Sequence, residues 1–196
     1  MSPSIPTAYI LAGPNGAGKT SLYWYEASAV PRLNGDTLYQ QGYDTYAVEA
    51  ALRQQLDRWV EQKASFVIET NAASQRDYDL FVSLKKAGYR LELRYVGLES
   101  VALCQQRVIQ RVIEGGHDVP PALVQHRYDS GLSLLKRHYR TFDQLQFYDN
   151  TGEQAQLLVS FLAATVPSTT NILPNWLGPV IQHITKMEKI YQRLSK

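Results

Sequence analysis

The octapeptide GPNGAGKT at residues 13–20 constrains the fold of this chain more than any other stretch. It matches the pattern G-x-x-x-x-G-K-[S/T] at every fixed position. Its three glycines allow the positive φ angles with which a backbone turns its N–H groups inward around a phosphate chain. Lys19 adds a mobile positive charge, and the hydroxyl of Thr20 is placed to bind a magnesium ion that the phosphates also hold. The octapeptide therefore predicts a phosphate-binding loop.

The segments on either side of this loop have the order that such a loop requires. Residues 7–12 form a short apolar run with the length of a buried parallel strand, and residues 21–28 can continue as a helix. That helix would point the positive end of its dipole at the bound anion. The alternative, a glycine-rich turn that happens to contain Lys-Thr, is disfavoured by this context. The expected nucleotide contacts are Gly13, Pro14, Asn15, Gly16, Ala17, Gly18, Lys19, Thr20 and Ser21.

Length and composition indicate one soluble α/β domain. The chain has 196 residues, of which 44% are hydrophobic and 19% are charged, and no apolar run approaches the about 18 residues of a membrane span. The first residues lack the features of a signal peptide, so we expect a cytoplasmic protein. Cys104 is the only cysteine, which rules out an internal disulfide and a thiolate metal cluster. With a net charge of +2, no stable nucleic-acid or membrane partner is expected.

Strand and helix patterns alternate along the rest of the chain. A short second strand is expected to end at 34–36, and further strands are expected at 65–68, 89–98 and 145–148. Helices are expected at 46–62, 74–87, 100–114, 120–137 and 153–164. This alternation implies an α/β fold with a mostly parallel sheet flanked by helices, in which ligands bind at the carboxyl ends of the strands.

A Pro-, Ser- and Thr-rich stretch divides the chain near its end. We expect a main domain at 1–165, a linker at 166–178 and an amphipathic helix at 179–196. The apolar side of this helix needs a partner. Packing on the main domain is the preferred interpretation, and a dimer contact or a membrane-surface role is the alternative. The positive charges on the helix are too few for strong attraction to lipid.

Polar residues follow the expected strands at the points where the strands end. Asp36 follows the second strand, Glu69 and Thr70 end the third, and Asn150 follows the last. Carboxylates beside a phosphate loop suit phosphoryl transfer, which needs a base, a magnesium environment and cationic groups. The alternatives are a turn-forming role for Asp36 and for Asn150, and for Glu69 an ion pair with a neighbouring lysine near a helix N-terminus.

Basic residues in the expected helix at 100–114 and beyond suggest a lid. Arg107 and Arg111 are four residues apart, so both project from one face of a helix and can hold one anion. Alone, they would be interpreted as a solvated basic face. The glycines at 115–116 and a third arginine, Arg127, favour a lid that closes over the phosphates. Which two of the three arginines act stays open, and His117 is expected to form hydrogen bonds in a loop rather than to bind metal.

Seven segments together make a specific set: AGPNGAGKT at 12–20, NGDT at 34–37, FVIET at 66–70, AGYR at 87–90, RVIQRV at 107–112, GGHDVP at 115–120 and YDN at 148–150. With this set the chain resembles the zeta toxin family of P-loop kinases, in particular its short stand-alone members, over about residues 7–152. Gly35 departs from the family pattern, which often has aspartate or alanine there, but Asp36 is kept.

The resemblance implies a P-loop NTPase fold with a helical lid at about 107–137 and an extra C-terminal helix. It also implies an ATP- and Mg²⁺-dependent kinase that phosphorylates a hydroxyl of a small acceptor, a sugar nucleotide such as UDP-N-acetylglucosamine, and an antitoxin as a possible partner. Asp36 would be the base, Glu69 and Thr70 would bind the acceptor, and Asn150 would contact the adenine. The groups that would stabilise the transferred phosphoryl group are Lys19, Arg107, Arg111 and Arg127.

Two other kinds of function stay open at this point. One is a P-loop kinase for a different acceptor, such as a nucleic-acid end, an antibiotic or a dinucleotide. The other is a non-kinase protein that uses nucleotide hydrolysis as a switch. Against the switch, the sequence contains no Asn-Lys-x-Asp guanine-recognition motif and no long aliphatic run followed by paired acids.

Overall fold

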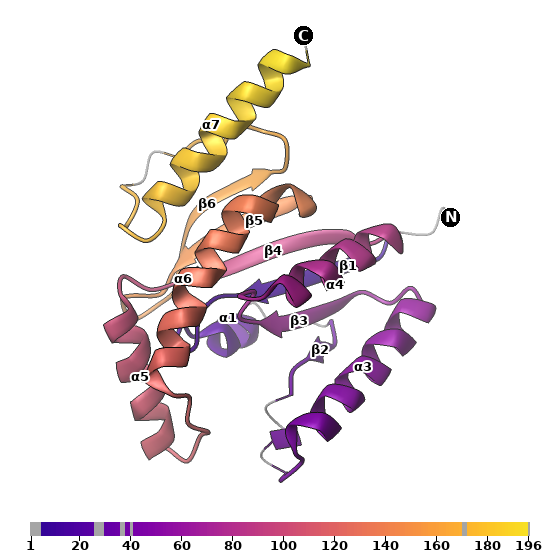
Figure 1. Ribbon diagram of the computed structural model, residues 1–196, viewed down its shortest axis with the longest axis vertical. Coiled ribbons are helices and arrows are strands. Elements are labelled where there is room, and N and C mark those ends of the chain that lie inside the picture. The colour runs from indigo at the N-terminus through magenta and orange to yellow at the C-terminus, as the bar shows by residue number, and fades with distance from the viewer. Residues whose placement is uncertain (1–4, 26–29, 36–37, 40, 170–171, 196) are drawn as a thin grey trace.

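A twisted sheet forms the centre of the molecule (Figure 1). The computed structural model describes residues 5–25, 30–35, 38–39, 41–169 and 172–195, with the backbone alone at positions 24 and 25. Within these residues the sheet has six strands in the order β2-β3-β1-β4-β5-β6. Their bounds are β1 Thr7–Ala12, β2 Arg32–Leu33, β3 Phe66–Thr70, β4 Arg90–Gly97, β5 Gln144–Asp149 and β6 Gln156–Leu162. The pairs among β1 to β5 are parallel, and β6 pairs antiparallel with β5.

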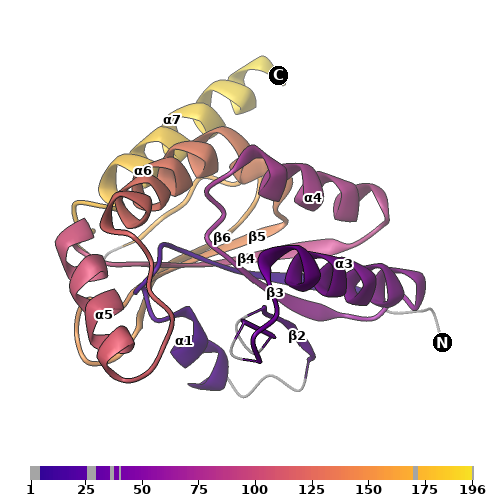
Figure 2. The same cartoon turned by 60° about the horizontal axis from the view of Figure 1, so that its bottom comes forward.

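Helices cover both faces of this sheet (Figure 2). The described helices are α1 Lys19–Tyr25, α3 Thr45–Glu61, α4 Gln75–Lys86, α5 Val101–Ile113, α6 Pro121–His138, the short 3-10 helix η1 Tyr139–Thr141 and α7 Gly178–Leu194. Helices α3, α4, α6 and α7 lie on one face, and α1 and α5 lie on the other. None of the described helices has the length and apolar character that a membrane crossing needs.

The central strand β1 contributes to a hydrophobic core on each face. Ala8, Ile10 and Ala12 belong to the cluster that packs under α3, α4, α6 and α7, whereas Leu11 belongs to the cluster under α1 and α5. Side chains along a strand alternate between faces, so a strand buried on both faces is apolar throughout. This explains why residues 7–12 form a continuous apolar run and why the sequence alone predicts the strand there.

The expected helix at 153–164 is wrong. Gln156–Leu162 forms β6, which pairs antiparallel with β5 and covers its outer edge. Val159 and Phe161 are buried, while Ser160 and Leu162 between and beyond them are exposed. This alternation has the period of a strand. The sequence suggested a helix because this alternation is short and the neighbouring leucines also fit a helical pattern.

The C-terminal segment shares the hydrophobic core of the main domain. In α7, Val180, Ile181 and Ile184 are buried in the same cluster as the central strands. Glu188 is fully buried and accepts hydrogen bonds from Tyr139 Oη at 2.6 Å and from Arg140 Nε and Nη2 at 2.8 and 2.7 Å. The segment 166–178, expected to be a linker, ends with Trp176 and Leu177 buried.

Candidate functional site

The phosphate-binding loop connects β1 to α1, as the sequence predicted. Gly13 and Gly16 have φ angles of +141° and +79°, which L side chains rarely adopt. Space restricts the same positions: a Cβ on Gly13 would lie 2.1 Å from Val96 O, and one on Gly16 would lie 2.4 Å from Cys104 O. The loop is therefore pressed against the end of β4 and against α5, where only glycine fits.

Lys19 lies inside this loop. Its Nζ donates to Gly13 O at 2.8 Å, to Pro14 O at 3.1 Å and to Asn71 Oδ1 at 3.5 Å. The side chain is buried, and it lines a pocket at the carboxyl edge of the sheet. The ammonium group therefore lies beside the loop backbone at the pocket, where the loop N–H groups would meet a phosphate chain.

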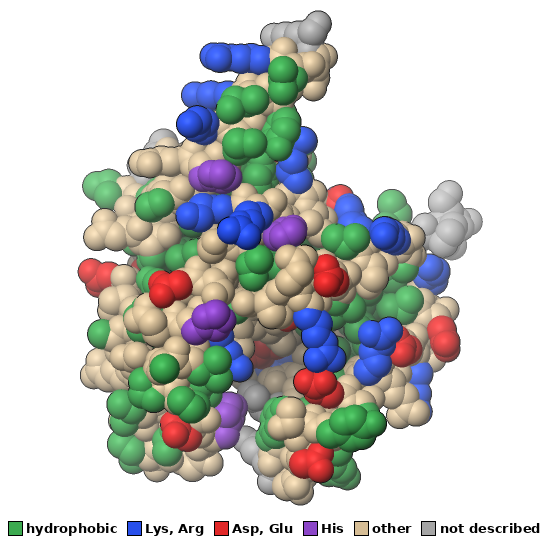
Figure 3. Space-filling view, viewed as in Figure 1, with side chains coloured by type: hydrophobic (Ala, Val, Ile, Leu, Met, Phe, Trp, Pro, Cys, Tyr) green, Lys and Arg blue, Asp and Glu red, His purple; other side chains and the backbone are tan. Residues whose placement is uncertain are grey.

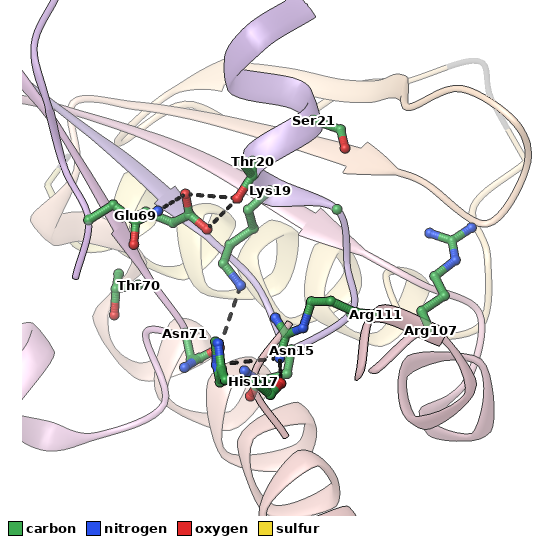
Figure 4. A pocket seen from close by; sticks show the side chains of 13 residues that line it. Asn15, Lys19, Thr20, Ser21, Glu69, Thr70, Asn71, Arg107, Arg111 and His117 are labelled. Carbon is green, nitrogen blue, oxygen red and sulfur yellow. Dashed lines mark hydrogen bonds between the residues drawn. The ribbon is translucent and has the colours of Figure 1, made fainter. Parts of the chain in front are cut away.

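Glu69 at the end of β3 lies directly beside Thr20. The register of β1 and β3, in which Leu11 pairs with Glu69, places the two strand ends at the same edge. Thr20 Oγ1 donates to Glu69 Oε1 and Oε2 at 3.1 and 3.3 Å (Figure 4). Arg32 Nη1 forms an ion pair with Glu69 Oε2 at 3.0 Å, and Asn34 Nδ2 donates to the same oxygen at 3.4 Å. Glu69 thus forms an ion pair with an arginine of β2, whereas the alternative drawn from the sequence was a neighbouring lysine.

The Thr20 hydroxyl and the Glu69 carboxylate fit a magnesium ion. Mg²⁺ prefers hard oxygen ligands and is commonly held by one or two protein oxygens together with phosphate oxygens and water. Both side chains line the pocket next to the phosphate loop. The donor set on this side of the pocket is therefore suited to a magnesium–nucleotide complex.

The three arginines expected in a lid occupy different positions around the loop. Arg127 Nη1 donates to Asn15 Oδ1 at 2.9 Å, and burial lowers the pKa of the Arg127 guanidinium. Arg111 Nη2 donates to His117 O at 2.9 Å, and the two residues lie together at the pocket in Figure 4. Arg107 lies one turn earlier in α5, and its Nη2 donates to Thr151 O at 3.3 Å. Arg107 and Arg111 line the pocket, whereas Arg127 reaches the phosphate loop itself.

The pocket has a volume of about 370 Å³, within the range of small-molecule sites. In the space-filling view the surface is hollowed between the lower ends of α5 and α3 (Figure 3). The residues that line the pocket are Asn15, Gly16, Gly18, Lys19, Thr20, Ser21, Asn34, Glu69, Thr70, Asn71, Arg107, Arg111 and His117.

A second, smaller pocket of about 150 Å³ lies on the other side of Gly18. It contains Asn150, the residue expected near the adenine, together with Ser21 and Leu22 of α1. Asn150 Nδ2 donates to Ala17 O at 2.8 Å, so its amide is joined to the phosphate loop.

Most of the residues predicted from the sequence gather at this edge of the sheet. Asp36 lies outside the described residues. Thr70 lines the pocket, but its Oγ1 donates to Asp77 Oδ1 at 2.8 Å and is thus occupied at the start of α4. Sequence reasoning missed Asn71 and Arg32. Asn71 directly follows the end of β3, so the rule that selected Glu69 also indicates this position; the two-residue strand that holds Arg32 carries no comparable signal.

The fold and the glycine loop together define a P-loop NTPase fold, as the sequence predicted. No family profile matches this sequence, and no curated protein matches it. Comparison with solved structures finds the same fold in a chain of the AvrRxo1-ORF1:-ORF2 complex with ATP, with a TM-score of 0.62 and 16% identity. The alignment covers 92% of this chain and 63% of that chain, so the present chain spans less than two thirds of its length.

Two further structures extend the comparison. A chain of the PezAT chromosomal toxin–antitoxin system of Streptococcus pneumoniae aligns with a TM-score of 0.60 and 18% identity, over 99% of this chain and 86% of that chain. A chain of the Pnkp1/Rnl/Hen1 RNA repair complex aligns with a TM-score of 0.58 and 16% identity, over 69% of this chain and 47% of that chain. The resemblance to zeta toxins therefore holds at the level of the fold.

Proposed function

We propose that this protein is a zeta-toxin-like kinase that transfers the γ-phosphoryl group of ATP to a hydroxyl of a sugar nucleotide such as UDP-N-acetylglucosamine. The observation that carries the proposal is the pocket in which the loop lysine Lys19, the Thr20–Glu69 pair and the lid residue Arg111 meet. Phosphoryl transfer needs little covalent chemistry from a protein, so positioning and charge stabilisation of this kind account for most of the catalysis.

Each group in the pocket has a role on the donor side. Lys19 now donates to Gly13 O and Pro14 O, and it would exchange these carbonyls for oxygens of the β and γ phosphates. Thr20 and Glu69 would hold Mg²⁺, which neutralises charge on the phosphates when bound. Arg32 and Asn34 orient the Glu69 carboxylate toward Thr20.

For the lid we propose that Arg111 and Arg127 contact the transferred group. Arg111 and Asn15 both line the pocket, and Arg127 already donates to Asn15 of the phosphate loop. Guanidinium groups at these places stabilise the charge that develops on the phosphoryl oxygens more strongly in the transition state than in the ground state. Arg107, which donates to Thr151 O, would support the nucleotide side of the pocket.

For the acceptor side we propose Asp36 as the base that orients and deprotonates the acceptor hydroxyl. The proposal comes from the resemblance, and Asn34, two residues earlier, lines the pocket. The part of the pocket beyond the phosphate loop, next to Thr70 and Asn71, is the proposed acceptor subsite. An antitoxin partner is proposed because one similar fold comes from a toxin–antitoxin system, PezAT, and another from a complex of two proteins, AvrRxo1-ORF1:-ORF2.

The direct test is an acceptor panel. Purified protein is incubated with ATP, Mg²⁺ and UDP-N-acetylglucosamine, and in parallel with an RNA 5′ end, an aminoglycoside and NAD, and phosphorylated products are identified by mass spectrometry. We expect a phosphorylated sugar nucleotide and its loss in Asp36→Asn. If only the RNA end is phosphorylated, the acceptor is a nucleic acid and not a sugar nucleotide. Unchanged turnover in Asp36→Asn would remove Asp36 as the base.

A further inference from the structure

Trp176, in the segment between β6 and α7, makes a polar contact with the end of β5. Its indole Nε1 donates to Asp149 Oδ1 at 2.8 Å, and the side chain is only 5% exposed. A buried N–H that meets a carboxylate forms one of the stronger hydrogen bonds in proteins. Residues separated by 27 positions in the sequence are thus joined at the carboxyl edge of the sheet.

Packing determines where this indole lies. Gly97 at the end of β4 pairs with Asp149, and a Cβ on Gly97 would lie 2.5 Å from the Trp176 ring. The indole also stacks against Tyr95, with ring centroids 6.0 Å apart. The missing side chain at Gly97 therefore makes the space in which Trp176 rests on the sheet beside Asp149.

Asp149 begins a turn that is organised by its carboxylate. Thr151 Oγ1 donates to Asp149 Oδ1 at 3.0 Å, and Thr151 N lies 3.3 Å from Oδ2. The backbone N–H of Glu99 donates to Thr151 Oγ1 at 2.9 Å, and Arg107 Nη2 donates to Thr151 O. The turn therefore binds both the start of the segment that leads into α5 and Arg107, which lines the pocket.

The middle residue of the turn touches the phosphate loop. Asn150 Nδ2 donates to Ala17 O at 2.8 Å, and a Cβ on Gly18 would lie 2.2 Å from the same nitrogen. A displacement of the turn would therefore move the Asn150 amide relative to the loop and open or close the smaller pocket that Gly18 and Asn150 line.

We infer that Trp176 is a positioning residue of the nucleotide site, because its N–H holds Asp149 and thereby places Asn150 against the phosphate loop and Thr151 O under Arg107. The inference rests on the proposed use of this site for ATP. Without the indole donor, Asp149 Oδ1 keeps only Thr151 as a partner among the described residues, and the turn loses this hydrogen bond to the C-terminal segment while the Asn150 N–H still donates to Gly97 O at 3.0 Å. Trp176 is in this sense part of the nucleotide site.

The test compares Trp176→Phe with Leu177→Ala. Phenylalanine keeps an aromatic ring on Gly97 but has no N–H, whereas Leu177→Ala removes a fully buried apolar side chain in the same segment. Affinity for a non-hydrolysable ATP analogue is measured by calorimetry, and the melting temperature is measured for both variants. We expect Trp176→Phe to weaken the nucleotide about tenfold, in keeping with the loss of a hydrogen bond to a charged group. Leu177→Ala is expected to lower the melting temperature at least as much while changing affinity by less than about twofold, because it only leaves a cavity.

Equal affinity in Trp176→Phe and the parent would overturn the inference. So would a loss of affinity in both variants that follows their loss of stability, since Trp176 would then be merely structural. Because no acceptor is present in the binding measurement, a parent that binds ATP but phosphorylates no sugar nucleotide overturns the proposed acceptor alone. A parent that does not bind ATP overturns both proposals.

Discussion

The hydroxyl of Thr20 lies 3.1 Å from Oε1 and 3.3 Å from Oε2 of Glu69, so that the residue after the loop lysine meets the acid at the end of the neighbouring strand. Arg32 and Asn34 hold one oxygen of the same carboxylate. An acid that is placed by three neighbours beside a phosphate loop is suited to a metal ion or its bound water. This pair is the most direct link between the structure and the proposed phosphoryl transfer.

Replacing Glu69 with glutamine tests that link. We expect Mg²⁺-dependent turnover to fall about 10–100-fold, as for other residues that orient or bind a metal, because the amide lacks the negative charge that attracts Mg²⁺. Affinity for ATP without Mg²⁺ is expected to change little. Turnover is measured as a function of Mg²⁺ concentration. Glu92→Gln, which removes a carboxylate paired with Arg90 near the other end of the strands, is the matched control; equal effects in both variants would contradict the assignment.

The lid is tested by Arg111→Ala. If Arg111 acts on the transferred group, kcat falls by about 10³-fold while the KM for ATP changes little, since the interaction is strongest in the transition state. Arg53→Ala removes an arginine that is 73% exposed and paired with Asp57 on the surface of α3, and it is expected to leave both parameters unchanged. A rise in KM alone after Arg111→Ala would assign Arg111 to nucleotide binding instead.

Gly13→Ala is expected to abolish nucleotide binding. Its φ of +141° is strained for alanine by about 1–3 kcal/mol, and the added Cβ would also meet Val96 O at 2.1 Å. The loop must therefore shift, and its N–H groups with it. Calorimetry with an ATP analogue measures the loss. Gly178→Ala adds a methyl group where no atom lies within 4 Å and is expected to bind as the parent does; binding by Gly13→Ala at parental affinity would contradict the assigned loop.

The pH dependence of stability tests the attachment of α7. Hydrogen bonds from Arg140 hold the pKa of Glu188 below its usual range. Because the folded-state pKa is lower than the unfolded one, the contribution of Glu188 to stability is present above the unfolded pKa of about 4.3 and is lost as pH falls through the folded value. Denaturant unfolding at pH 7 and in the acid range measures it.

Glu188→Gln is expected to lower the free energy of unfolding by about 1–3 kcal/mol at pH 7, and the difference from the parent is expected to shrink as the pH falls below about 4. The effect is expected because the neutral amide cannot accept both hydrogen bonds of the Arg140 guanidinium. Glu49→Gln removes an exposed partner of Arg76 and is expected to cost little at either pH. A pH-independent difference between Glu188→Gln and the parent would show that the charge of Glu188 does not matter.

The sequence predicted those parts of the fold and site that depend on local rules. The loop, the strand before it and the helices capped by Ser74 and Ser100 follow from glycine chemistry, apolar periodicity and side-chain caps. The joining of Thr20 to the end of β3 follows from the meeting of parallel strand ends. These features can be predicted from a few neighbouring residues or from one rule of sheet topology.

The remaining features depend on long-range packing. The sequence of β6 also fits a helix, because Leu157 and Leu158 interrupt a short alternating pattern. Trp176 lies in a stretch whose composition indicates a linker, and its burial depends on Gly97, Tyr95 and Asp149, which are distant in the sequence. Arg32 reaches Glu69 from a two-residue strand, and a sequence pattern of that length carries no information about a partner 37 positions away.

The contact between Gly16 and the carbonyl of Cys104 restricts how this protein can move. Cys104 and Val108 are buried on the sheet, so the first half of α5 is anchored to the rigid body that carries the loop. On α6, Val124 is buried in the same cluster, so Arg127 in the following turn is held to the same rigid body, and a motion that brings Arg111 onto a phosphate is confined to the chain between Val108 and Val119. Gly115, with a φ of +89°, follows the end of α5 and turns the chain toward α6. Closure of the proposed lid would then move only the end of α5 and the connection to α6, with the remainder of the molecule at rest.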